Sequence, residues 1–288
     1  MKDFFGLFSG RSVRTFTFAI AATAVIALAP QAGAAGSPAR LVIGGTGTAL
    51  GGMQLLAKAF SEDHPEIKTV VLPSLGSGGG IKALDAGKID LALSARPLKD
   101  KESAKGLSAT LYARTPIVFA THKKTPSGNV TLSELPGIYS GATSKWQDGT
   151  PLRLILRPEQ ESDTQLLRGL SRELDAAIAT AFTRNELLVA VTDQDNASAL
   201  ETIPGSLGLT TLAQILSESR NLKPLTFDGQ VASVDGLHSG DYPYCKTLYL
   251  VVGKDPSEAL EAFVTYVFSK TGRDILTATG HDVAEPGR

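Results

Sequence analysis

Short apolar runs and amphipathic segments alternate from residue 41 onward, and this alternation limits the possible folds more than any other feature of the chain. The strand-like runs lie at 41–44, 67–73 and 89–95, and helix-like segments at 51–63 and 79–87 separate them. Strands that alternate with helices usually pair in parallel, and the helices cover both faces of the sheet. The sequence therefore predicts an α/β fold.

Two long runs rich in β-branched and aromatic residues, at 111–123 and 246–254, show no helical period. A second block of alternating strands and helices lies between them. We expect the two runs to pair and to cross between two lobes, each of them a mainly parallel sheet flanked by helices. The predicted lobe 1 comprises residues 35–118 plus 246–288, and the predicted lobe 2 comprises residues 119–245.

Residues 1–34 have the features of a secretory signal peptide. Basic residues precede an apolar run at 18–29, and Ala32-Gly33-Ala34 has the small-x-small form of a cleavage site. The apolar run is shorter than the roughly 20 residues that a membrane-spanning helix needs. A buried N-terminal helix is the alternative interpretation. We expect cleavage near Ala34 and export to the periplasm.

Charge and cysteine content argue against several kinds of partner. The formal net charge is −1, and no basic run or aromatic-interleaved basic patch indicates nucleic acid. The single cysteine, Cys245, cannot form an internal disulfide, and we expect it to be a buried apolar residue. The histidines lack the spacing of metal ligands; they are His64, His122, His238 and His281.

Five stretches of the chain together carry a family pattern. They are GTGTALGG (45–52), PSLGSGGGIKALDAGKIDLALSARPLKDKE (73–102), WQDGTPLRLILRPEQESDTQLL (146–167), IPGSLGLT (203–210) and YPYCKTLYLVVGK (242–254). Their order and content resemble the phosphate-binding-protein-like family of substrate-binding proteins of ABC importers, which are type II periplasmic binding proteins. The resemblance implies a two-lobed protein that closes on an oxyanion at the interface between its lobes.

The resemblance also implies which residues contact the ligand, because members of the family use helix N-termini and the loops before them. At the matching positions of this sequence these residues are Thr46, Gly47, Thr48, Ser77, Gly78, Gly79, Ser94, Arg96, Arg157, Ser162, Asp163 and Thr164. Turns rich in Gly, Ser and Thr that precede a helix offer N–H and hydroxyl donors to an anion. A guanidinium from the facing lobe, that of Arg157, adds a bidentate pair of donors.

Each of these stretches also has a purely structural interpretation. The turn at 46–48 is compatible with a plain strand-to-helix connection. Arg157 is compatible with a surface or ion-paired arginine, and Arg96 with an exposed charge. The glycines that follow Ser77 cost backbone entropy, which favours a close approach of the backbone to a ligand.

Two positions depart from the family pattern. Phosphate-binding members often carry an aspartate after the serine that ends the third strand, where it accepts the proton of hydrogen phosphate; the residue here is Ala95. In the second lobe the usual Ser-Gly-Thr is Ser162-Asp163-Thr164. A carboxylate repels an anion unless it accepts a proton from that anion or points away from it. Two interpretations stay open: Asp163 replaces the missing proton acceptor, or the ligand is not phosphate.

These features together predict a monomeric periplasmic solute-binding protein. We expect it to capture a small oxyanion, with phosphate as the first candidate, and to deliver the anion to the permease of an ABC transporter. We expect no catalytic residue, no cofactor and no bound metal. The first alternative is a sensor or scavenger that uses the same cleft without transport.

Two enzyme classes are further alternatives. An exported hydrolase or phosphatase would need a nucleophile elbow, but none of Ser77, Ser206 and Ser239 lies in a G-x-S-x-G sequence. A nicotinamide-dependent enzyme would need a charged residue at the end of the second strand, and VVLPSLG provides none. Both classes fit the sequence poorly.

Overall fold

The part of the chain that the structure describes is a mixed β-sheet flanked by helices. The computed structural model of the 288-residue chain describes residues 39–284. The predicted signal peptide, residues 1–34, lies outside the described residues. None of the helices within residues 39–284 is long and apolar enough to span a membrane.

The strands and helices alternate along the first part of the chain, as the sequence predicts. The strands are β1 (Ala39–Gly45), β2 (Ile67–Val71), β3 (Leu91–Ser94), β4 (Ser108–His122), β5 (Asn129–Val130), β6 (Arg153–Leu156), β7 (Leu188–Val189), β8 (Ser206–Thr211), β9 (Leu222–Pro224), β10 (Thr226–Phe227), β11 (Cys245–Val252) and β12 (Asp282–Val283). The helices are the 3-10 helix η1 (Gly47–Ala49) and the α-helices α1 (Leu50–Asp63), α2 (Gly76–Asp85), α3 (Asp100–Ser103), α4 (Leu135–Ser140), α5 (Ser162–Arg168), α6 (Arg172–Ala181), α7 (Asp193–Thr202), α8 (Leu212–Ser217), α9 (Val234–Ser239), α10 (Glu258–Phe268) and α11 (Lys270–Ala278).

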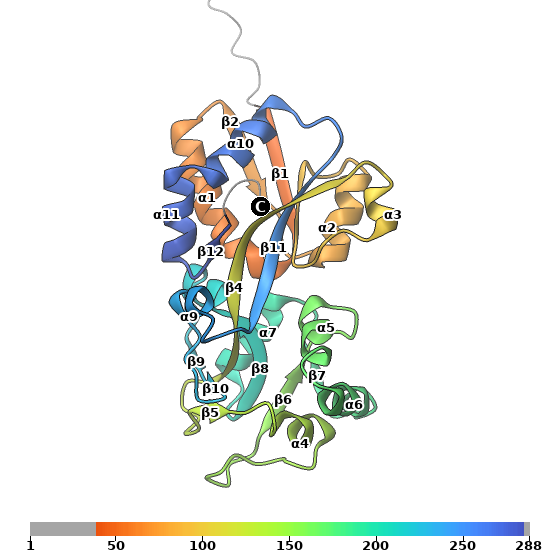
Figure 1. Cartoon of the computed structure of the whole chain (residues 1–288), viewed down its shortest axis with the longest axis vertical. Coiled ribbons are helices and arrows are strands. Elements are labelled where there is room, and N and C mark those ends of the chain that lie inside the picture. The colour runs from red at the N-terminus through yellow and green to blue at the C-terminus, as the bar shows by residue number, and fades with distance from the viewer. Residues whose placement is uncertain (1–38, 285–288) are drawn as a thin grey trace, which may run out of the picture. The chain divides into compact units, whose positions relative to one another are not determined.

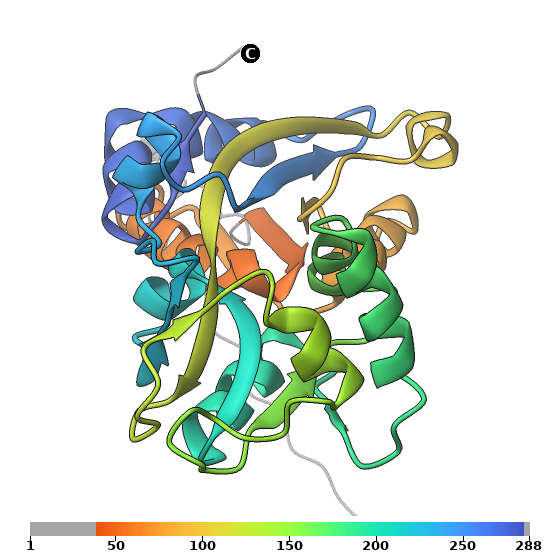
Figure 2. The same cartoon turned by 60° about the horizontal axis from the view of Figure 1, so that its bottom comes forward.

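The sheet runs in the order β2-β1-β3-β11-β4-β8-β6-β7. At one end β1 pairs in parallel with β2 and β3, and at the other end β6 pairs in parallel with β7 and β8. Between these ends β4 and β11 pair antiparallel with each other, and both run from one end toward the other (Figures 1 and 2). We call β2-β1-β3 with α1, α2, α10 and α11 the β1 half, and β8-β6-β7 with α4 to α7 the β8 half. This arrangement confirms the predicted α/β fold and the pairing of the two long strands.

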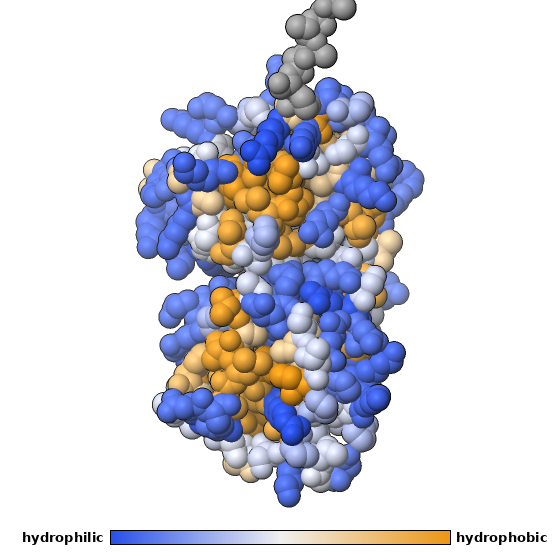
Figure 3. Space-filling model, turned by 180° about the vertical axis from the view of Figure 1, so that it is seen from behind, coloured by the Kyte–Doolittle hydropathy of each residue, from blue (hydrophilic) through white to orange (hydrophobic). Residues whose placement is uncertain are grey.

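Separate groups of buried apolar side chains stabilise the two halves. In the β1 half Phe60 packs edge-to-face on Phe263, with ring centroids 5.2 Å apart. In the β8 half a different cluster surrounds Phe119, and along β4 the change from one cluster to the other falls between Ala113 and Ile117. Seen from behind, each half shows an apolar area, and a mainly hydrophilic band lies between the two areas (Figure 3). The exact lobe boundaries stay a prediction, which this separation of the apolar clusters supports.

Helix α2 begins at Gly76, whereas the sequence predicts a start at residue 79. The residues 77–79 therefore form its first turn and not a loop before it. Gly80 lies against β1, because a Cβ atom at Gly80 would be 2.7 Å from the Cα of Gly45. The glycine run allows this close packing, and its low helix propensity hides the start of the helix from a sequence pattern.

Candidate functional site

Four buried charged side chains meet where the two halves touch. Arg157 follows the last residue of β6, Asp163 lies in the first turn of α5, Asp193 begins α7, and Lys246 is the second residue of β11. Their exposed fractions are 5%, 3%, 5% and 2% in that order. We call these four residues the charge cluster. Two cations face two carboxylates, so the ionised cluster has no net charge.

All three guanidinium nitrogens of Arg157 donate to groups of the β8 half. Nε lies 3.3 Å from Oδ2 of Asp163, and Nη2 lies 3.3 Å from Oδ2 of Asp193. Nη1 donates to the carbonyl oxygen of Ala190 at 2.6 Å. The hydroxyl of Thr164 donates to the carbonyl oxygen of Arg157 at 3.1 Å and fixes the backbone beside it. The guanidinium is therefore committed to partners within the protein.

Lys246 connects the charge cluster to the β1 half. Its ammonium forms a close ion pair with Oδ1 of Asp163 and lies 3.9 Å from Oδ1 of Asp193. It also donates to the hydroxyl of Thr48 at 3.0 Å, and that hydroxyl donates to Oδ1 of Asp193 at 2.8 Å. A Cβ atom at Gly47 would be 2.5 Å from Oδ2 of Asp193, so the turn at η1 can approach α7 only with glycine at this position.

The carboxylate of Asp163 is kept ionised by its neighbours. Burial by itself would raise the pKa of Asp163, but the charges and hydrogen bonds of Lys246 and Arg157 outweigh burial and lower that pKa from its ordinary value of 3.8. The position of Asp163 in the first turn of α5 favours the charged form further, because a helix N-terminus stabilises negative charge.

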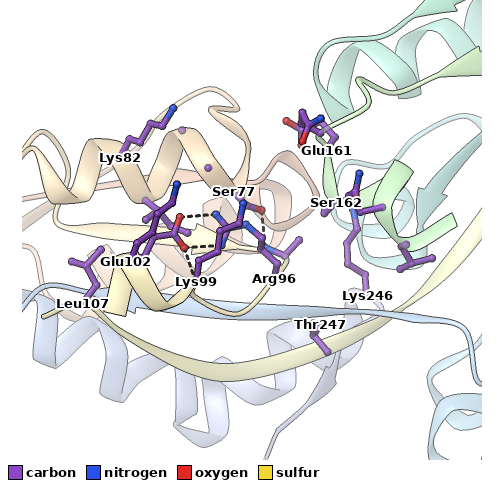
Figure 4. A pocket seen from close by; sticks show the side chains of 18 of the residues that line it. Ser77, Lys82, Arg96, Lys99, Glu102, Leu107, Glu161, Ser162, Lys246 and Thr247 are labelled. Carbon is purple, nitrogen blue, oxygen red and sulfur yellow. Dashed lines mark hydrogen bonds and ion pairs between the residues drawn. The ribbon is translucent and has the colours of Figure 1, made fainter. Parts of the chain in front are cut away.

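A cleft of about 820 Å³ opens beside the charge cluster. Ser77 and Arg96 lie on one side of the cleft, and Ser162 and Lys246 lie on the other (Figure 4). A Cβ atom at Gly78 would meet no atom within 4 Å, so the first turn of α2 is open at this residue, whereas a Cβ atom at Gly76 would be 2.9 Å from Oε1 of Glu161. The first N–H groups of an α-helix have no partner within the helix. The cleft therefore offers backbone donors from α2 together with the ammonium of Lys246.

Basic side chains outnumber acidic ones in the wall of the cleft. The basic side chains are Lys82, Arg96, Lys99, Lys101, Lys105 and Lys246, and the acidic ones are Asp85, Glu102 and Glu161. Arg96 donates from both terminal nitrogens to Glu102 at 2.8 Å, and these hydrogen bonds lower the pKa of Glu102 to about 2 (Figure 4). Lys105 pairs with Asp85. The excess of positive charge favours an anionic occupant.

The structure brings the predicted site residues into one region but sorts them into three groups. The residues that line the cleft are Ser77, Gly78, Gly79, Arg96 and Ser162. The residues that form or contact the charge cluster are Gly47, Thr48, Arg157, Asp163 and Thr164. Two buried residues have structural hydrogen bonds. The N–H of Thr46 donates to the carbonyl oxygen of Leu93 at 2.9 Å, and the hydroxyl of Ser94 donates to the carbonyl oxygen of Arg96 at 2.7 Å. Whether each one contacts a ligand stays a prediction.

Two residues of the charge cluster were not among the predicted site residues. Lys246 stands next to an apolar strand sequence, and a lysine beside such a strand is a recognisable signal of a buried ion pair or a binding role. Asp193 gave no such signal, because an acidic residue at the start of a helix is fully explained by the helix dipole.

Cys245 lines the same cleft and is half-buried, so the prediction of a buried cysteine is wrong. It opens β11 beside Lys246, where β11 pairs with β4 but not yet with β3 and borders the cleft. Partial burial raises the pKa of the Cys245 thiol. Within residues 39–284, no group of three His, Cys, Asp or Glu side chains is arranged to hold a metal ion.

Comparison with known proteins gives a family match over most of the chain. The model described as "PBP superfamily domain" matches residues 32–271. The phosphate-binding protein PstS 2 of Streptococcus agalactiae is 27% identical over 112 residues, which are 39% of this chain and 38% of that protein, so the chain spans less than half of its length. The phosphate-binding protein PstS of Borreliella burgdorferi is 22% identical over 218 residues, which are 73% of this chain and 78% of that protein.

Solved structures with the same fold include two proteins of phosphate transport. One, from Clostridium perfringens, is described as a phosphate ABC transporter substrate-binding protein with bound phosphate; it has a TM-score of 0.73 and 19% identity, covering 85% of this chain and 100% of that chain. The other is an ABC-type phosphate transport receptor from Vibrio cholerae, with a TM-score of 0.59 and 18% identity, covering 84% of this chain and 99% of that chain. At these identities the likeness establishes the fold.

Proposed function

Since the chain belongs to the PBP superfamily, we propose that it is a periplasmic solute-binding protein that captures a small oxyanion, with phosphate as the first candidate. The anion occupies the cleft between the β1 half and the β8 half, and the loaded protein delivers it to the permease of an ABC transporter. The names of the relatives support this proposal, because they are phosphate-binding proteins by name.

One observation carries the proposal: the cleft has a positive wall and a set of backbone donors at a single place. The first turn of α2, at Ser77 to Gly79, faces Ser162 and Lys246 across the cleft. Backbone N–H groups at a helix N-terminus and a nearby ammonium together bind an oxyanion without chemistry on it. In this proposal the protein binds its ligand and releases it unchanged.

Arg157 has a supporting position in this proposal. It does not line the cleft, and its nitrogens are occupied by Asp163, Asp193 and Ala190. It holds Asp163 and the N-terminus of α7 in place, while Lys246 is the cation that meets the ligand.

Thermal unfolding with a panel of anions tests the proposal. The protein is first unfolded and refolded to remove any bound ligand, and then heated with phosphate, sulfate, molybdate, tungstate or a phosphonate. A ligand at a hundred times its Kd adds roughly 2.7 kcal/mol to the free energy of unfolding. For a chain of this size we expect an increase in Tm of about 5–10 °C with phosphate. An unchanged Tm with every anion of the panel would contradict the proposal.

Uptake by whole cells distinguishes transport from sensing or scavenging. Cells that lack the gene should take up radiolabelled phosphate more slowly than cells that carry it, when phosphate is limiting. If the two kinds of cell take up phosphate equally fast while the purified protein binds phosphate, the transport role is wrong.

A further inference from the structure

Asp163 occupies the place in the charge cluster that best suits an external oxyanion. Its two carboxylate oxygens face two different cations: Oδ1 pairs with the ammonium of Lys246, and Oδ2 lies 3.3 Å from Nε of Arg157. The side chain also stands in the first turn of α5, where negative charge is favoured. Two cations on two oxygens is an arrangement that also suits a phosphate or a sulfate.

The positive charges around Asp163 are fully balanced by carboxylates, so no positive charge is left for a second anion. Arg157 and Lys246 carry two positive charges, and Asp163 and Asp193 carry two negative charges, all at 5% exposure or less. Asp193 is held separately by the hydroxyl of Thr48 and by Nη2 of Arg157. An anion that contacts the ammonium of Lys246 therefore lies next to the carboxylate of Asp163, which binds the same ammonium.

Lys246 is the member of the charge cluster that also lines the cleft, together with Ser77 and Ser162. The ammonium therefore has two possible partners, Asp163 inside the protein and an anion in the cleft. Like charges that bind the same ammonium repel each other strongly in a buried site. Asp163 and the anion therefore exclude each other, or they share the ammonium and each binds it more weakly.

We propose that Asp163 is an internal counter-anion that competes with the external oxyanion for Lys246, and that it thereby sets the affinity and the anion selectivity of the cleft. This inference rests on the proposed function, because it assigns a role to Asp163 at the same binding site. It opposes the interpretation in which Asp163 accepts a proton from the ligand, since that interpretation makes Asp163 a favourable contact.

Neutralising Asp163 distinguishes these roles. Asp163→Asn keeps the size of the side chain and removes its charge, and Asp163→Ala also vacates the space. Binding of inorganic phosphate is measured by calorimetry, and Tm is measured with and without phosphate. We expect both variants to bind phosphate at least tenfold more tightly than the unmodified protein. We also expect a lower Tm without phosphate, because Arg157 and Lys246 then share one carboxylate, and recovery of the Tm when phosphate is added.

Asp175→Asn is the matched control. Asp175 lies on α6 of the same half and pairs with Arg168 at the surface, where its side chain is 50% exposed. This substitution removes one carboxylate from an arginine pair outside the cleft. The phosphate affinity of the control should equal that of the unmodified protein.

The outcomes separate failure of this inference from failure of the proposed function. If the unmodified protein binds phosphate and both Asp163 variants bind it equally or more weakly, Asp163 is not a competitor, and the proposed function stands. If neither the unmodified protein nor a folded variant binds any anion of the panel, both proposals are wrong. Should the variants fail to fold, the 13Cγ signal of Asp163 in the unmodified protein decides: it should shift when phosphate saturates the cleft, and an unchanged signal at saturation would overturn the inference.

Discussion

The charge cluster and the cleft beside it share Lys246 but differ in how their charges are satisfied. In the charge cluster every charge has an internal partner and almost no solvent exposure. In the cleft basic side chains exceed acidic ones, and the first turn of α2 is open at Gly78. The comparison indicates that the cluster holds the halves in register, whereas the cleft retains binding capacity for an external anion.

Replacing Lys246 should have the largest effect on stability. In Lys246→Met, Asp163 and Asp193 share only Arg157, and removing one member of a buried ion pair costs about 3–5 kcal/mol. Urea unfolding measures the loss. Lys101→Met is the control, because Lys101 lines the cleft without belonging to the cluster, and its loss should be less than about 0.5 kcal/mol. Equal losses in the two variants would remove the distinction between cluster and cleft.

The charge cluster and His281, a second buried titratable group, should affect the free energy of unfolding over different ranges of pH. Burial lowers the pKa of His281 to about 4 from its ordinary value of 6.5. As the pH falls from 6.5 to 4, the unfolded chain binds a proton that the folded chain does not, so about 3 kcal/mol of stability is lost. The contribution of Asp163 is instead present above pH 3.8 and is lost below it, because the pKa of Asp163 is lowered in the folded protein.

His281→Gln should therefore flatten the dependence of the free energy of unfolding on pH between 6.5 and 4. Urea unfolding at pH 7, 5.5 and 4 measures this dependence. The loss below pH 4 should persist in the variant, because the carboxylate of Asp163 causes it. A pH dependence identical to that of the unmodified protein would show that His281 does not control this range.

Two glycines of α2 distinguish packing from ligand contact within the cleft wall. Gly80→Ala forces a methyl group to within 2.7 Å of the Cα of Gly45, and such overpacking should cost about 1–3 kcal/mol. Gly78→Ala meets no atom within 4 Å and should leave stability equal or slightly higher, since alanine favours helix. We expect Gly78→Ala to weaken phosphate binding about tenfold, because its methyl group faces the incoming anion. Unchanged affinity in Gly78→Ala would place the anion elsewhere in the cleft.

Breaking the Arg96–Glu102 pair should have a smaller effect on stability than Lys246→Met or Gly80→Ala. The two side chains are 25% and 15% exposed, and a partly exposed pair contributes about 1 kcal/mol or less. Glu102→Gln leaves Arg96 with more positive charge toward the cleft, so phosphate affinity should rise a few-fold and fall more steeply with salt. Calorimetry at low and physiological ionic strength measures both. A stability loss above about 2 kcal/mol would mean that this pair supports α3 and the cleft wall.

The sequence predicts the fold well where the signal is local. The alternation over residues 41–95 predicts β1, α1, β2 and β3, because the period of apolar residues differs between strands and helices. The two long strands were recognisable by their length and composition. The start of α2 was missed, because a helix whose first turn is mostly glycine has no apolar period and low intrinsic propensity.

The charge cluster could be predicted only in part, because its contacts join distant positions. Thr48 and Lys246 are 198 residues apart in the chain, and Thr48 and Asp193 are 145 residues apart. A sequence pattern identifies Arg157 and Asp163 as unusual, but it does not show which cation faces which carboxylate. That pairing is decided by where β11 crosses between the halves, which is a property of the folded sheet.

Titration of the refolded protein with phosphate by calorimetry tests whether the cleft binds the anion through Lys246. We expect one saturable site per chain in the unmodified protein, and binding at least tenfold weaker in Lys246→Met under conditions where circular dichroism shows that the variant is folded. Phosphate binding of equal strength in a folded Lys246→Met variant, or no saturable binding in the unmodified protein, would contradict the account.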